Sequence, residues 1–389
     1  MMQNRLEKND GFTLIEMLIA MVLFIVVIMI TANIFELMLP KTKIITKSEE
    51  SNVEGIIGLE MFRRDLEQAG FGLFTDIDSP PPNYNEAASA PQSDYNDAPN
   101  SIPKAIFAKN NLTSYVLTDT DYLVIKATNA ALNPASQCWT SIKGSGSSKI
   151  WGANDLQQDR KDWVAVVSQG FRNGELQRKL IYDTVSPTSF TVAYKADGAY
   201  AEPFAPSSSD KQYFYYGIDS VAPRAPFNRT DYYVKRVAGD VPDGCSPAAG
   251  VLYKSVMSQK DGSMQAIAVL DCVADMQVVL GWNTSGDPTG NVEDTWTNAD
   301  GNLPTGGTTA ADEWLKDSRE IRNRLKTVRV YILAQDGGFD KNYSNTNTAM
   351  RVGEAGETGD PKFIDLTTPD RIRYRWKLHR LVVRPKNLN

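Results

Sequence analysis

The chain has 389 residues, and its 41 Lys and Arg against 47 Asp and Glu give a formal net charge of −6. This mildly acidic balance argues against nucleic acid as a partner, because phosphate binding requires a basic footprint. The length is sufficient for one or two folded domains.

The first predicted element is a membrane-spanning helix near the N-terminus. Fourteen consecutive apolar residues, 17–30, follow a single carboxylate, Glu16. A charged side chain near the bilayer core costs roughly 2.5–3.5 kcal/mol, so a lone acid there indicates a partner or a function. Residues 17–39 number 23. As a helix they would extend about 34 Å, enough to cross the hydrocarbon core.

The helical pattern continues beyond the membrane segment and becomes amphipathic. Gly70 and Gly72 then supply a stop signal. We predict a helix from Phe12 to about Gly70, kinked or locally melted at Pro40, whose second half packs on a sheet. Its apolar positions recur at spacings of three and four: Val53, Ile56, Ile57, Leu59, Phe62, Leu66 and Ala69.

Residues 73–103 are rich in Pro, Asn and Ser and indicate an irregular linker or loop. Beyond them, short β-branched and aromatic runs separated by turn residues predict a β-rich head over residues 104–389. The predicted strands cover residues 122–125, 163–167, 180–182, 190–194, 213–216, 232–234, 251–253, 266–270, 276–280 and 328–333.

The last predicted strand, residues 371–378, alternates strictly between basic and apolar residues. Such alternation places four cations on one face and four apolar groups on the other. The basic face is either an ordinary solvated surface or a contact surface for an acidic neighbouring subunit or phospholipid headgroups.

The N-terminal residues Gly11-Phe12-Thr13-Leu14-Ile15-Glu16 and the apolar run after them resemble the signal of type IV prepilins and pseudopilins. The resemblance implies that a prepilin peptidase cuts between Gly11 and Phe12 and that the new Phe12 amine is N-methylated. It also implies that Glu16 acts in filament assembly. A secretory signal with a chance Glu fits less well, because the apolar stretch is long and no small-residue cleavage site closes it.

The same resemblance implies an α+β, pilin-like fold, in which a long N-terminal helix packs on a large antiparallel β-rich head. It divides the chain into a leader (1–11), the transmembrane half of the helix (12–39), its amphipathic half (40–72), a linker or loop (73–103) and a periplasmic head (104–389).

Several later segments resemble the PilW type of minor pilin. Residues 60–72 are similar to its Asp-Leu-x-Gln-Ala-Gly-Phe signature, and residues 325–333 to its late strand. This resemblance implies a structural subunit that helps to initiate type IV pilus assembly and sits in the tip complex. The alternatives are a J-type minor pseudopilin of type II secretion and a tip adhesin.

The resemblance further implies the location and partners of such a subunit. Before assembly it would cross the inner membrane once and hold its head in the periplasm, and afterwards it would lie at the pilus tip on the cell surface. Its partners would be the prepilin peptidase, other minor pilins, the major pilin and, in one alternative, a tip adhesin.

The head shows little that indicates catalysis or a cofactor. His379 is the only histidine and has no acid nearby in sequence, so we interpret it as a structural residue. We therefore expect that the chain is not an enzyme. A loop near residue 290 offers oxygen ligands for calcium: Asn283, Asp287, Asn291, Glu293 and Asp294. These residues lack the EF-hand spacing, and the alternative interpretation is an ordinary solvated loop.

Three cysteines, Cys138, Cys245 and Cys272, in a periplasmic head indicate one disulfide and one remaining thiol. Cys245 with Cys272 is the more local pairing, and the other pairings stay open.

Overall fold

The chain folds as two compact units, residues up to Glu50 and residues Ser51–Asn389. The computed structural model describes residues 13–144, 146, 148–151, 155–172, 175–285, 293–303, 311–353 and 362–388.

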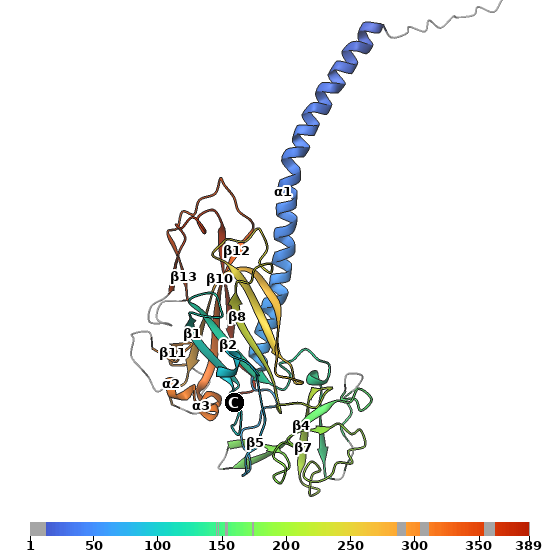
Figure 1. Cartoon of the computed structure of the whole chain (residues 1–389), viewed down its shortest axis with the longest axis vertical. Coiled ribbons are helices and arrows are strands. Elements are labelled where there is room, and N and C mark those ends of the chain that lie inside the picture. The colour runs from blue at the N-terminus through green and yellow to red at the C-terminus, as the bar shows by residue number, and fades with distance from the viewer. Residues whose placement is uncertain are drawn as a thin grey trace, which may run out of the picture. The chain divides into compact units, whose positions relative to one another are not determined.

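The N-terminal unit is helical. Helix α1 begins at Leu14 and ends at Gln68, in the second unit (Figure 1). Its 23-residue stretch Leu14–Glu36 is long and apolar enough to span a membrane, and none of it is buried. The helical backbone continues through Pro40, so of the two outcomes that we predicted there, local melting is wrong and a kink stays a prediction. Proline removes one backbone hydrogen bond, and the neighbouring turns keep theirs.

The second unit is built on an eight-stranded antiparallel sheet, in the order β1-β2-β8-β9-β10-β12-β15 with β11 paired to β10. With α1, this β-rich region confirms the predicted α+β class. Its strands are β1 (Ile106–Leu112), β2 (Thr120–Ala127), β8 (Asn228–Lys235), β9 (Gly250–Met257), β10 (Met264–Trp282), β11 (Thr295–Asn298), β12 (Leu325–Asp336) and β15 (Arg375–Val383).

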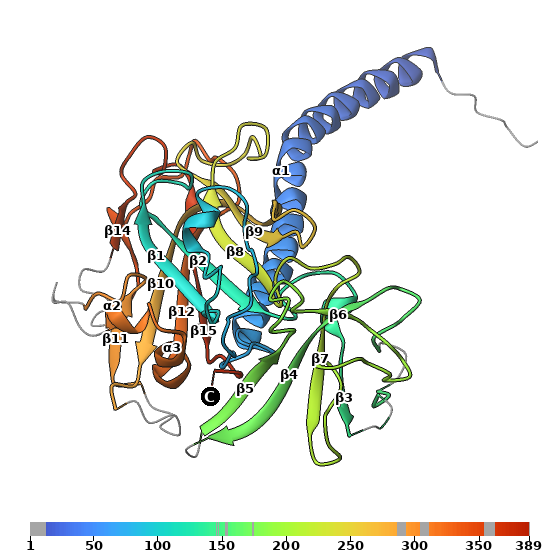
Figure 2. The ribbon, with the colours of Figure 1, turned by 60° about the horizontal axis from the view of Figure 1, so that its bottom comes forward.

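A second sheet is inserted between two strands that pair directly in the first. β2 pairs with β8, and the chain between them forms a five-stranded antiparallel sheet in the order β3-β7-β4-β5, with β6 paired to β4 (Figure 2, green). Its strands are β3 (Trp139–Lys143), β4 (Trp163–Arg172), β5 (Glu175–Ile181), β6 (Val192–Ala193) and β7 (Gln212–Asp219).

The remaining elements are short. They are the 3-10 turns η1 (Gln92–Tyr95) and η2 (Ala135–Gln137), the helices α2 (Ala311–Trp314) and α3 (Ser318–Arg324), and the hairpin β13 (Ala349–Val352) with β14 (Lys362–Asp365).

The end of α1 packs on the main sheet through small and aromatic residues. The Phe62 ring stacks on Tyr232 of β8 with their centroids 3.8 Å apart, and both side chains are fully buried. Ile56 and Ile57, which we expected on the contact face, are about two-thirds exposed. Gly55 and Gly58 lie against β10 instead, where an added Cβ would collide with it. The two glycines therefore permit the close approach of α1 to β10. The apolar pattern had assigned this contact to Ile56 and Ile57.

Residues 73–103 are irregular apart from η1, and buried charges hold them on the main sheet. Lys126 of β2 lies 2.6 Å from Glu86 and 2.7 Å from Asp97, and all three side chains are almost completely buried. Arg229 of β8 adds contacts to Glu86 at 3.5 Å and Asp231 at 2.8 Å. Buried charges persist only when they are paired, so this network fixes the path of the segment across the sheet.

Two strand predictions need correction. Residues 266–270 and 276–280 belong to one strand, β10, which bends at register shifts between Leu270 and Val273. The predicted basic strand 371–378 begins only at Arg375, because Thr368 O accepts bonds from the N–H groups of Arg371 and Ile372 and holds this stretch in turns. The four cations therefore do not share one face.

Candidate functional site

The N-terminus of α1 is closed by a reciprocal pair of hydrogen bonds between Thr13 and Glu16. The Thr13 N–H and hydroxyl each donate to Glu16 Oε2 at 2.9 Å, and the Glu16 N–H donates to Thr13 Oγ1 at 3.4 Å. This is a capping box, which satisfies backbone donors that a helix start leaves unpaired. The Thr-x-x-Glu spacing of a capping box is visible in the sequence, but our interpretation of Glu16 from the sequence did not include a capping role.

Glu16 remains available for a second interaction. It is the only charged residue between Leu14 and Phe35, and its side chain is exposed. Its Oε1 atom accepts no hydrogen bond from the residues that the structure describes. The cap thus uses one oxygen and presents the other on an apolar helix. A carboxylate in such surroundings favours a cationic partner. Gly11 and Phe12, the predicted cleavage residues, lie outside the described residues.

The second half of α1 is held on the head by a buried polar contact. Asp65 Oδ2 lies 2.5 Å from Lys254 Nζ on β9 and accepts a 2.7 Å hydrogen bond from the Tyr232 hydroxyl on β8. Lys254 is almost fully buried, so the carboxylate compensates a charge that would otherwise be costly. One helical side chain therefore fixes the register of α1 against two strands.

A disulfide joins Cys245 and Cys272, with their Cα atoms 5.0 Å apart. It ties the loop between β8 and β9 to β10 close to the bend of that strand. Cys138 is buried beside Arg160, whose Nη2 lies 3.8 Å from its sulfur. Burial raises the pKa of the Cys138 thiol, so this thiol is a weak nucleophile.

The calcium candidates that the structure describes already have protein partners. Glu293 contacts Arg384 at 3.4 Å, and Asp294 accepts bonds from the N–H and hydroxyl of Thr284. Asp287 and Asn291 lie outside the described residues. Within the described part of the chain, no group of three or more His, Cys, Asp or Glu side chains could hold a metal ion.

His379 lies in β15 opposite Ile332 of β12 and is partly buried. Burial lowers its pKa, and the positive charge of Lys377 lowers it further. Both effects favour the neutral form of the imidazole.

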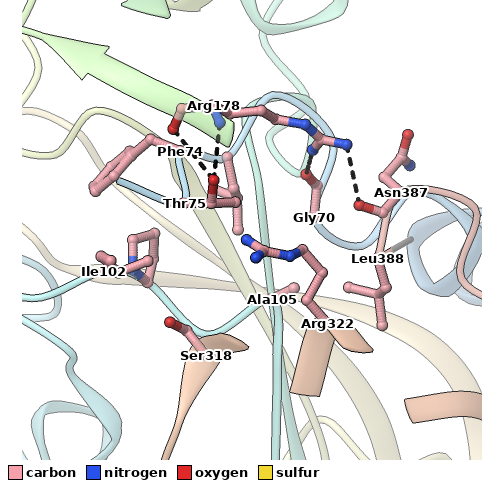
Figure 3. A pocket seen from close by; sticks show the side chains of 12 residues that line it. Gly70, Phe74, Thr75, Ile102, Ala105, Arg178, Ser318, Arg322, Asn387 and Leu388 are labelled. Carbon is pink, nitrogen blue, oxygen red and sulfur yellow. Dashed lines mark hydrogen bonds between the residues drawn. The ribbon is translucent and has the colours of Figure 1, made fainter. Parts of the chain in front are cut away.

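A small cavity marks the junction of four parts of the second unit (Figure 3). Gly70 after α1, Arg178 of β5, Arg322 of α3 and the C-terminal residues Asn387 and Leu388 surround about 20 Å³ of space, room for about one water molecule. Arg178 donates to the carbonyl oxygens of Gly70 at 3.3 Å and Asn387 at 3.5 Å. The cavity joins the inserted sheet to the end of α1 and is too small for an organic substrate.

Residues 7–32 match the family described as the prokaryotic N-terminal methylation motif. Neither a curated protein nor a solved structure matches the chain. The matched segment contains Glu16 and the start of the apolar helix. The N-terminus therefore carries a prepilin-like signal of the kind found in type IV pilins and pseudopilins, and the helix that follows it is long and apolar enough to anchor in a membrane.

Proposed function

We propose that the chain is a minor pilin, a structural subunit that helps to initiate type IV pilus assembly and sits in the tip complex. The observation that carries this proposal is Glu16, the only charged residue between Leu14 and Phe35 of an exposed apolar helix that begins inside a methylation motif. An exposed apolar surface of this length requires lipid or other helices around it.

In the proposed mechanism, prepilin peptidase cuts between Gly11 and Phe12, and the Phe12 amine is N-methylated. Helix α1 then leaves the membrane and packs beside the helices of other subunits. Glu16 Oε1 receives the Phe12 amine of a neighbouring subunit, while Thr13 holds Oε2 and sets the orientation of the carboxylate. An unpaired charge inside the filament is heavily penalised, so this pair selects one axial register.

The head supports a specialised subunit of the PilW type rather than a repeated shaft subunit. It contains a main sheet, on which α1 docks, and a complete inserted sheet, which adds bulk beyond what docking of α1 requires. We place the head in the periplasm before assembly and at the pilus tip afterwards, in contact with other minor pilins and the major pilin. The Cys245–Cys272 disulfide suits an oxidising compartment of this kind.

The role of Glu16 can be separated from its capping function by two substitutions. Glu16→Gln keeps an acceptor for the Thr13 N–H and removes only the charge, whereas Glu16→Ala removes both. We expect both variants to lose their leader normally, as measured by mass, and both to fail to support pili in cells that lack the wild-type chain. Glu36→Ala, which removes the charge at the other end of the span, is the matched control. Normal piliation with Glu16→Gln would overturn the charge-pairing role.

A tip adhesin is the second candidate, and an exposed aromatic cluster on the inserted sheet favours it. Trp151 is half exposed, and its ring lies 4.8 Å from Trp139 and beneath the Lys149 ammonium group at 4.0 Å. Deletion of the gene distinguishes the candidates. Loss of all pili supports an initiating minor pilin, normal pili with lost adherence support an adhesin, and impaired protein secretion supports a J-type pseudopilin.

A further inference from the structure

The edges of the two large sheets differ in how they are protected. An edge strand presents unpaired backbone N–H and C=O groups, which can pair with a strand from another chain. The main sheet ends at β1 and β15, and the inserted sheet ends at β3 and β5.

Three of these four edges are interrupted or partly covered by the chain itself. On β1, the register shifts around Asn111, which has a positive φ of 45° and interrupts the ladder. On β5, the Leu180 N–H donates to Asp76 O at 3.1 Å, so residues beside the strand already occupy its edge. On β3, the Lys149 N–H donates to Ser141 O at 3.1 Å. Bulges and covering segments of this kind prevent edge-to-edge association.

β15 lacks such protection within the part of the chain that the structure describes. Its nine residues pair with β12 from Arg375↔Asp336 to Val383↔Val328 without a register shift. The strand contains no proline. Among the described residues, no second strand or loop backbone pairs with Arg375 to His379. This half of the strand therefore presents a regular, open edge.

The side chains along this edge are basic. The strand contains Arg375, Lys377 and Arg380 and no carboxylate. Asp340 holds Arg375 at 3.0 Å, and Arg380 lies over the Tyr331 ring at 5.9 Å. Lys377 is exposed opposite Ala334, in the middle of the open segment. Opposite charges across neighbouring strands are favourable and like charges are not, so the edge favours an acidic strand.

We propose that β15 accepts an extended acidic segment of a partner polypeptide as an added strand. A second copy of the same strand is a poor occupant, because two such strands would bring six cations together without a carboxylate (three from each strand). Strand addition supplies affinity through backbone hydrogen bonds and specificity through alternate side chains. The inference goes beyond the minor-pilin proposal, because it rests on the edge of β15 and does not depend on which assembly the chain joins.

Synthetic peptides test the proposal on the full chain in detergent micelles. The probe is an alternating Glu/Val peptide of about ten residues, long enough to cover the strand. We expect it to slow hydrogen exchange at those amides of residues 375–379 that point away from β12. Two N-methylated forms, blocked at odd or at even positions, separate pairing from simple charge attraction. Only one set of amides faces β15, so one form should lose binding and the other should retain it.

Charge reversal supplies the second arm. Lys377→Glu should weaken binding of the acidic peptide about fivefold to tenfold, because it replaces attraction with repulsion. Lys143→Glu, an exposed position on edge strand β3, is the matched control and should leave binding unchanged. Circular dichroism and the urea midpoint verify that both variants fold.

Two results would overturn the proposal. Equal binding by both N-methylated peptides would show attraction by charge alone, without strand pairing. Protection of the same amides by an anionic lipid added to the micelles, with no protection by the peptide, would assign the basic strand to a membrane surface.

Discussion

Lys126→Met should destabilise the head by about 3 kcal/mol, because it removes the cation that two buried carboxylates share. Lys126 is fully buried, with its Nζ 2.6 Å from Glu86 and 2.7 Å from Asp97. Methionine retains an unbranched apolar side chain of similar length, so the change is chiefly electrostatic. The loss of stability should appear first in residues 73–103, because these carboxylates anchor that segment to the sheet.

The expected size follows from the partners that remain. Removing one member of a buried ion pair costs about 3–5 kcal/mol, because the other charge is left uncompensated. Glu86 keeps Arg229 at 3.5 Å, and Asp97 keeps Lys104 at 2.6 Å. These contacts place the expected loss at the lower end of the range.

Lys109→Met is the matched control on neighbouring strand β1. Its ammonium group lies 2.9 Å from Asp300, but the Lys109 side chain is 45% exposed. An exposed pair contributes about 0–1 kcal/mol. Urea unfolding of the full chain in detergent, followed by fluorescence of the seven Trp residues, compares the variants. Losses that agree within about 0.5 kcal/mol would refute the reasoning, because burial would then confer no extra sensitivity.

Two further predictions use the same unfolding assay. Gly58→Ala should lower the free energy of unfolding by about 1–3 kcal/mol, because its Cβ would lie 2.2 Å from the backbone oxygen of Val269. Gly55→Ala should lower it less, because its Cβ would meet the movable Leu270 Cδ1 at 2.6 Å. Equal losses in the two variants would contradict this. Complete burial raises the pKa of Asp121 from 3.8 to about 8. The folded state then holds a proton that the unfolded chain releases, so stability should fall as pH rises from about 4 to 8, and Asp121→Asn should reduce that slope.

Local patterns predicted the helix and most of the strands. The apolar run and the three-and-four spacing identify α1, and the β-branched runs identify β2, β4, β7, β8, β9 and β12. Such patterns depend only on neighbouring residues, so they remain readable without tertiary contacts. Ile56 and Ile57 show where they fail. Apolar spacing favoured these residues for the contact face, but close packing against β10 required Gly55 and Gly58.

The buried ionisable side chains could not be predicted for a different reason. All eight residues of β2, Thr120–Ala127, are buried, although the strand includes Asp121 and Lys126. A charged residue in a strand normally indicates a solvent-facing position. Here the covering groups come from distant residues, Glu86 and Asp97 for Lys126 and the Val278 N–H for Asp121. The sequence carries no local signal of these pairings. In the same way, the partner of Glu16 was implied only by the resemblance to a family.

The position of the inserted sheet separates two tasks within the head. Its entry and exit lie side by side, since Ala127 pairs with Asn228, and the Asn228 amide donates to Thr128 O at 2.6 Å. An insertion whose ends are already adjacent adds residues without moving the strands that flank it, because the closure cost grows only slowly with loop length. Docking of α1 and the open edge of β15 belong to the main sheet. The exposed Trp151 cluster belongs to the inserted one. We therefore expect changes around Trp151 in the inserted sheet, away from the Arg178 contact at the end of α1, to alter what the head contacts while α1 stays docked.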